Sequence, residues 1–167
     1  MDETKSPNLG FKPADDDEAR PAGRLLALDL GAKRVGVAVS DEMRLTVRPL
    51  PALRRTNWKQ LVREAAALCE SLDVREVVIG LPLRLDGSEG DAAQDARRAA
   101  ESFAEELGLV VRLQDERLTS FAAEDALREQ GFSRDEIKKR VDSEAAAIIL
   151  RDHLEQLAAQ TNTFESE

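Results

Sequence analysis

The sequence has no run of about 18 apolar residues, which argues against a membrane-spanning helix. Its N-terminus lacks the apolar stretch of a secretory signal peptide. There is one cysteine, Cys69, so no internal disulfide can form, and we expect a cytoplasmic protein. There is also one histidine, His153, which disfavours a histidine-based metal cluster or a Ser-His-Asp triad. We expect His153 near the end of a surface helix.

A length of 167 residues suggests one folded domain, and both ends of the sequence are polar. The net charge is -9, but residues 1–20 alone contain six acids and three bases. Because both ends of the chain are polar and aperiodic, we expect a disordered acidic tail at 1–22 and a second disordered tail at 161–167. The folded domain is then expected at 23–160.

Apolar patterning and turn residues predict an alternation of strands and helices. Strands are expected at 25–30, 35–39 and 45–47, the third being ended by Pro49 and Pro51. Further strands are expected at 76–79 and 109–114. Helices are expected at 57–72, 91–107 and 119–131, followed by a short helix opened by the capping box at 133–136 and a last helix at 142–160. This order predicts an α/β fold in which helices flank a mixed five-stranded sheet whose first three strands form an antiparallel meander.

Asp29 interrupts the apolar strand expected at 25–30. A carboxylate buried there without a partner would cost several kcal/mol, so it must be paired, protonated or bound to a metal. Turn formation at a strand end is the simpler alternative.

Two further positions carry acids that can approach Asp29. Asp115 and Glu116 end the last expected strand, and strand ends are where sites form in sheets with parallel crossovers. Asp142 lies on the apolar face of the last expected helix, with Ala145, Ala146 and Ile149. Each acid alone could be a helix cap or a solvated strand end. Together they would repel one another unless divalent cations bind, and oxygen-only ligation suits Mg²⁺ or Mn²⁺. Two such ions about 4 Å apart can promote phosphodiester cleavage.

A stretch without acids, residues 43–63, reverses the sign of the charge. It contains Arg54, Arg55 and Lys59, as well as Trp58, the only tryptophan, which could stack on a base. Lys33 and Arg34 lie close to Asp29 in sequence. These six residues are candidate nucleic-acid contacts. A solvated helix face, with Trp58 packed on the sheet, is the alternative.

Four ordered segments of the chain resemble the motifs of the YqgF/RuvX family of Holliday junction resolvases. They are LDLGAKRVGVAVSD at 28–41, VIGLPL with DGSEG at 78–90, DERLTS at 115–120 and VDSEAAAIIL at 141–150. The resemblance implies an RNase H-like fold and a metal-dependent nuclease whose catalytic and metal-binding carboxylates are Asp29, Glu116 and Asp142. It thereby selects Glu116 over Asp115, although Asp115 could assist. It also implies branched DNA or the 5′ end of precursor 16S rRNA as substrate.

The chain departs from the related RuvC resolvases in lacking a fourth carboxylate near the last one. Lys139 and Ala145 occupy the positions three residues to either side of Asp142. Such a site could bind its second metal weakly, or only with substrate.

Two other functions compete with a nuclease. A binding module for nucleic acid or for ribosome maturation would need the basic stretch but not all three acids. An ATP-dependent phosphotransferase is suggested by Asp29-Leu30-Gly31 before a hairpin, which also resembles the actin, Hsp70 and sugar-kinase group. That group needs two such domains, whereas this chain has room for one. Finally, two-fold branched DNA is most simply cut by a two-fold protein, so a homodimer is a further hypothesis.

Overall fold

The computed structural model of the chain describes residues 23–116 and 119–164. The acidic tail expected at 1–22 and residues 165–167 lie outside the described residues. No helix in the described part of the chain is long and apolar enough to cross a membrane.

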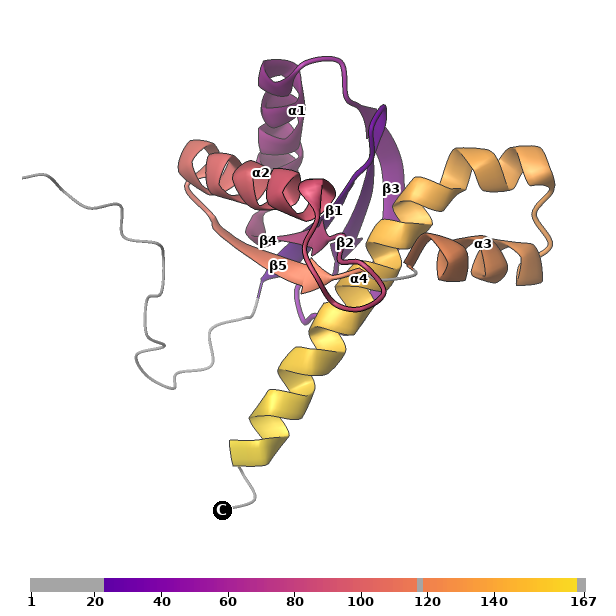
Figure 1. Cartoon of the computed structure of the whole chain (residues 1–167). Helices are drawn as coiled ribbons and strands as arrows, with labels where there is room; N and C mark the ends of the chain where they lie inside the picture. The colour runs from indigo at the N-terminus through magenta and orange to yellow at the C-terminus, as the bar shows by residue number, and fades with distance from the viewer. Residues whose placement is uncertain (1–22, 117–118, 165–167) are drawn as a thin grey trace, which may run out of the picture.

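A five-stranded sheet forms the centre of the molecule (Figure 1). Its strand order is β3-β2-β1-β4-β5. The first three strands pair antiparallel, whereas β4 is parallel to β1 and β5 is parallel to β4. The predicted mixed sheet and its opening meander are confirmed. The strands are β1 (Arg24–Leu30), β2 (Arg34–Ser40), β3 (Val47–Arg54), β4 (Val74–Leu81) and β5 (Val110–Asp115).

The third strand begins two residues later than predicted and runs farther. We expected 45–47, ended by the prolines, but β3 continues through Pro49 and Pro51 to Arg54. Strand β3 lies at the edge of the sheet, where a missing N–H can face away from the neighbouring strand. Its pairing with β2 also shifts register between Val35 and Val37, which relaxes the ladder near Pro51.

The first two helices follow the prediction closely. Helix α1 (Trp58–Ser71) is capped by the side chain of Asn57, which accepts a 2.8 Å hydrogen bond from the Gln60 N–H. Helix α2 (Asp91–Leu107) ends at Gly108, whose φ of 66° is the left-handed conformation that favours glycine. Helix α3 (Thr119–Glu129) precedes the turn at Gly131.

The last two predicted helices are one. The capping box forms as expected, with Glu136 accepting hydrogen bonds from the N–H and hydroxyl of Ser133. Helix α4 (Arg134–Phe164) then continues for 31 residues, because no proline or glycine interrupts it. Asp142 is therefore in the middle of a helix and not at its start. Residues 161–164, which we placed in the C-terminal tail, are helical.

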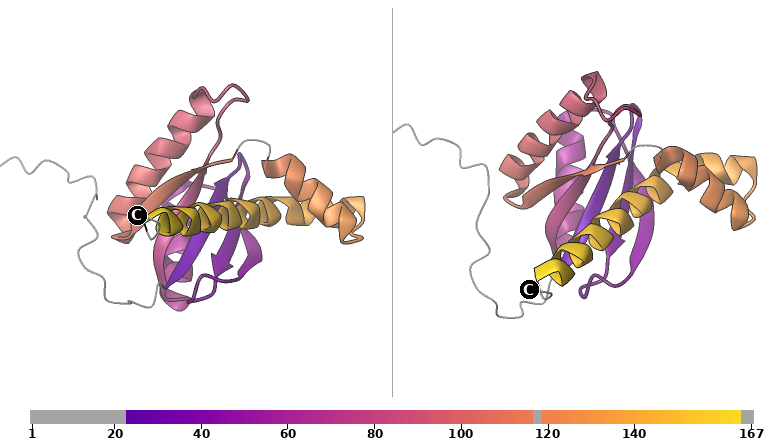
Figure 2. Two further views of the ribbon diagram at one scale, coloured as in Figure 1. Left: turned by 90° about the horizontal axis from the view of Figure 1, so that it is seen from below. Right: turned by 60° about the horizontal axis from the view of Figure 1, so that its bottom comes forward.

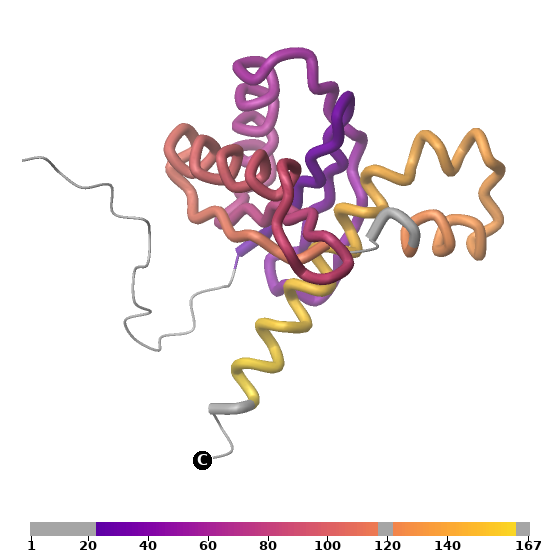
Figure 3. Tube along the Cα trace, in the orientation of Figure 1, coloured from indigo at the N-terminus to yellow at the C-terminus, as the bar shows by residue number. Residues whose placement is uncertain are grey.

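Helices cover both faces of the sheet (Figure 2). Helices α1 and α2 pack over Leu26, Leu28 and Val37 on one face. Helix α4 crosses the other face, where small residues such as Ala146 and Ala147 let it lie close to Leu25 and Ala27. Beyond the β3 edge, α3 doubles back along the first turns of α4, and the two form an arm (Figure 3).

Candidate active site

Asp29 lies at the carboxyl end of the central strand β1, on the face that α4 covers. Leu25 and Ala27 of the same strand pack beneath α4, and side chains alternate between faces along a strand. Asp29 therefore points to the α4 side, where its register partner on β2 is Gly36.

Glu116 reaches Asp29 from the end of β5. The Glu116 N–H donates a 3.1 Å hydrogen bond to the Leu81 carbonyl, which extends the pairing of β4 with β5 beyond Asp115. Its side chain lies over Gly80 of β4, where any Cβ would overlap the Glu116 carboxyl. Glycine at this position makes room for the acid, and the carboxyl groups of Glu116 and Asp29 share a hydrogen bond.

Asp142 approaches Asp29 from α4. Gly36 allows this approach, because a Cβ there would overlap the backbone of Asp142. Next to it, the Val37 N–H donates a 3.2 Å hydrogen bond to the Ser143 hydroxyl, which fixes the helix to β2. The position facing Asp29 across the ladder thus lies directly under Asp142.

The pKa values of Asp29 and Glu116 are both raised. Burial, with the charges of Asp29 and Asp115, raises the pKa of Glu116 to about 9. Burial also raises the pKa of Asp29; its hydrogen bond with Glu116 opposes this, and the charge of Asp142 adds to it. At neutral pH, Glu116 therefore keeps its proton, and its O–H donates a hydrogen bond to the Asp29 carboxylate.

In the described residues, no three acidic, histidine or cysteine side chains stand close enough together to hold a metal ion as a group. Asp29 and Glu116 are in contact, whereas the Asp142 carboxylate is ion-paired with Arg34, its Oδ2 lying 3.6 Å from the Arg34 Nε. The predicted set of metal ligands stays a prediction.

Three of the six predicted nucleic-acid contacts lie beside the acids. Arg34 pairs with Asp142, and exposed Lys33 precedes it in the hairpin between β1 and β2. Arg54 is the register partner of Arg34 on β3. Like charges directly opposite each other destabilise a sheet, and the Asp142 carboxylate offsets the charge of Arg34 here.

The other three predicted nucleic-acid contacts, Arg55, Trp58 and Lys59, have other roles or lie elsewhere. Arg55 donates a 3.1 Å hydrogen bond to the Gly31 carbonyl and contacts Asp95 at 3.3 Å, so it braces the hairpin that follows Asp29. Trp58 packs edge-on against Phe103, at 4.8 Å between ring centroids, on the sheet face opposite Asp29. Lys59 is exposed next to it on α1. The structure brings neither Trp58 nor Lys59 to the carboxylates.

His153 was misplaced by sequence analysis. It is buried, and its Nδ1 makes a 3.1 Å hydrogen bond with Gln114 Oε1. This bond links α4, which carries Asp142, to β5, which directly precedes Glu116. Burial lowers the pKa of His153, which keeps the ring neutral at pH 7. The spacing of 11 residues from Asp142, about three helical turns, would have predicted a common face had the helix been recognised as continuous.

Comparisons with known proteins bear on the family and the fold of the chain. A family model described as "RuvX: Holliday junction resolvase" matches residues 23–156. Relatives from Anaeromyxobacter sp. (strain Fw109-5) and Clostridium beijerinckii are 47% and 39% identical over 132 and 135 residues. These matches cover 79% and 81% of this chain and 96% and 98% of the relatives. Both relatives carry the name "Putative pre-16S rRNA nuclease". Among solved structures, the fowlpox virus Holliday junction resolvase matches with a TM-score of 0.50 and 16% identity, covering 80% of this chain and 99% of that one, which supports the RNase H-like fold.

Proposed function

Because the chain belongs to the RuvX family of Holliday junction resolvases, we propose that it is an endonuclease acting at Asp29, Glu116 and Asp142. The reaction is hydrolysis of phosphodiester bonds in structured nucleic acid. The observation that carries the assignment of the site is the contact of Asp29 with Glu116 under the charge of Asp142. Branched DNA, named for the family, and precursor 16S rRNA, named for the relatives, are the candidate substrates.

The donor chemistry fits a divalent cation. Asp29 and Glu116 would hold it, with Asp142 as the third ligand, and carboxylate oxygens suit Mg²⁺ or Mn²⁺. Burial and the charges of Asp29 and Asp115 raise the pKa of Glu116, and a bound cation would offset these charges. Once bound, one or two such ions would activate water and stabilise the leaving oxygen of the phosphodiester.

The surrounding residues position the substrate. Lys33, Arg34 and Arg54 offer positive charge beside the acids, so they can hold the phosphates that flank the scissile bond. Arg55 acts indirectly, because its hydrogen bond to Gly31 holds the turn after Asp29.

Cleavage of a labelled four-way junction and of a precursor 16S rRNA fragment, each with Mg²⁺ or Mn²⁺, tests the proposal. Wild type should cut at least one substrate, and Asp29→Asn should cut neither. Asp73→Asn is the matched control, since Asp73 is an exposed acid in the turn before β4, at the far end of the sheet. A wild-type protein that cuts neither substrate, or an active Asp29→Asn variant, refutes the nuclease.

The same samples separate the competing functions. Binding without cleavage would favour a module for nucleic-acid binding or ribosome maturation. Turnover of ATP would favour a phosphotransferase. For a resolvase we expect a homodimer, and sedimentation that detects only monomer, with and without junction DNA, would refute that expectation.

A further inference from the structure

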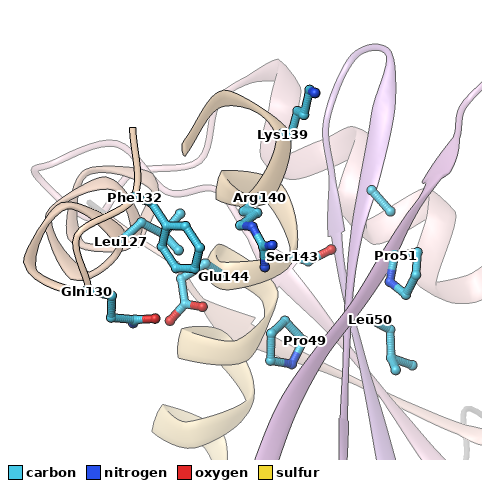
Figure 4. A pocket seen from close by; sticks show the side chains of 11 residues that line it. Pro49, Leu50, Pro51, Leu127, Gln130, Phe132, Lys139, Arg140, Ser143 and Glu144 are labelled. Carbon is cyan, nitrogen blue, oxygen red and sulfur yellow. The ribbon is translucent and has the colours of Figure 1, made fainter. Parts of the chain in front are cut away.

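A cavity of about 310 Å³ opens next to the candidate active site, between the edge strand β3 and the arm formed by α3 and α4 (Figure 4). Ser143 lines it and accepts a hydrogen bond from the Val37 N–H, next to the position over which the Asp142 backbone lies, so the cavity lies beside the segment of α4 that carries Asp142. Its volume is near the lower end of pockets for small organic molecules, roughly 300–1,000 Å³. It can take a group about as large as one nucleotide but not a helix or a duplex.

The charge of the cavity favours an anion. Lys139 and Arg140 line it, in a chain whose net charge is -9. Because α4 is continuous, these cations lie within a helix, and no helix end accounts for them. Glu144 also lines the cavity, but its carboxylate is ion-paired with Arg151 at 3.6 Å.

The cavity also offers partners for a planar group. The Arg140 guanidinium lies 4.5 Å from the centroid of the Phe132 ring, and both belong to the wall (Figure 4). Aromatic rings and guanidinium planes are the surfaces on which unpaired bases stack. Gln130 and Ser143 add hydrogen-bonding groups beside them.

The opposite wall argues against a peptide. Pro49 and Pro51 of the edge strand line the cavity, and neither has a backbone N–H. A peptide that extends the sheet needs such donors along the edge, so strand addition is disfavoured here. The proline rings instead form an apolar wall.

We propose that this cavity receives an unpaired nucleotide of the bound nucleic acid, its base against the stacked Arg140–Phe132 pair and its phosphate at the rim near Lys139 (Figure 4). The inference rests on the proposed nuclease function, because the nucleic-acid substrate of that function supplies the strand that passes Asp142. It adds a preference: substrates with an unpaired nucleotide beside the cleavage point bind better than fully paired ones.

Binding to the full-length protein in EDTA tests this without cleavage. Two labelled hairpin duplexes are compared by fluorescence anisotropy, one blunt and one with a short single-stranded tail carrying 2-aminopurine at its first unpaired position. Wild type should bind the tailed duplex more tightly, and the 2-aminopurine emission should change on binding. Phe132→Leu, which keeps apolar bulk but removes the aromatic plane, should weaken tailed binding by roughly fivefold or more and spare the blunt duplex.

Arg140→Ala should behave in the same way. Arg134→Ala is its control, because it removes the same charge from the first turn of α4 outside the cavity lining. Equal affinity of wild type for both duplexes, or equal losses on both duplexes in Phe132→Leu and Arg140→Ala, overturns the inference. If wild type prefers the tailed duplex and these variants lose that preference, the inference is upheld. It is upheld even if wild type cuts no substrate, because the absence of cleavage refutes only the proposed function. If wild type cuts a substrate but shows no preference for the tailed duplex, the proposed function stands and the inference about the cavity is refuted.

Discussion

The Glu116–Asp29 pair should make the metal-free protein lose stability as the pH rises. The pKa of Glu116 is about 9 in the folded chain, against an ordinary value of 4.5. Between these values the folded state keeps a proton that the unfolded state releases. Linkage then requires the free energy of unfolding to fall as the pH increases through this window.

The size of the effect follows from the same shift. One such group changes the free energy of unfolding by at most about 1.4 kcal/mol per pH unit, or about 2.7 kcal/mol from pH 6 to 8. Glu116 is half-buried and shares its ionisation with Asp29, so we expect about 1 kcal/mol. Glu116→Gln removes the titration while its amide can still donate to Asp29. The pH-dependent loss should therefore be about 1 kcal/mol smaller in this variant.

Urea unfolding in EDTA at pH 6 and pH 8 gives the free energy of unfolding of wild type and of Glu116→Gln. Comparing the change in wild type with the change in the variant cancels other titrating groups, including His153. Glu70→Gln, an exposed acid on α1, serves as the control and should match wild type. Identical pH dependence in wild type and Glu116→Gln would refute the shared proton. Adding Mg²⁺ should stabilise wild type more at pH 8 than at pH 6, because the ligands must be ionised.

Four other substitutions test how the site is built. Gly36→Ala should lower the free energy of unfolding by about 2 kcal/mol or more, since its methyl group overlaps the α4 backbone; unchanged urea unfolding would contradict this packing. Arg54→Ala should reduce the salt slope of junction binding by about 1 and leave stability unchanged or slightly higher, since it removes the like charge opposite Arg34, whereas Arg55→Ala should lower stability; equal effects in both assays would contradict the division of roles. His153→Leu should lower the free energy of unfolding by about 1–3 kcal/mol, as it leaves the Gln114 carbonyl without its donor; a wild-type denaturation midpoint would show that the buried bond is dispensable.

Local patterns predicted most of the elements. The apolar runs give β1 and β2, Asn57 and Gly108 mark helix ends, and the capping box at Ser133 opens α4. The errors arose where local signals have two meanings. Prolines end a central strand but are tolerated at an edge. The basic run Lys138-Lys139-Arg140 suits the end of a helix but here lies within one.

The sequence by itself determined that an acid interrupts a buried strand, that other acids follow at a strand end and on an apolar helix face, and that four motifs occur in the order of one family. These properties depend on residue type and spacing along the chain, which a single sequence contains. Only the tertiary structure decided which groups meet. Gly36 and Gly80 let α4 and Glu116 close around Asp29, Arg55 turns to the backbone, and Trp58 packs on the other face. Contacts between residues far apart in sequence depend on strand order and on the close approach of layers, and neither leaves a local pattern.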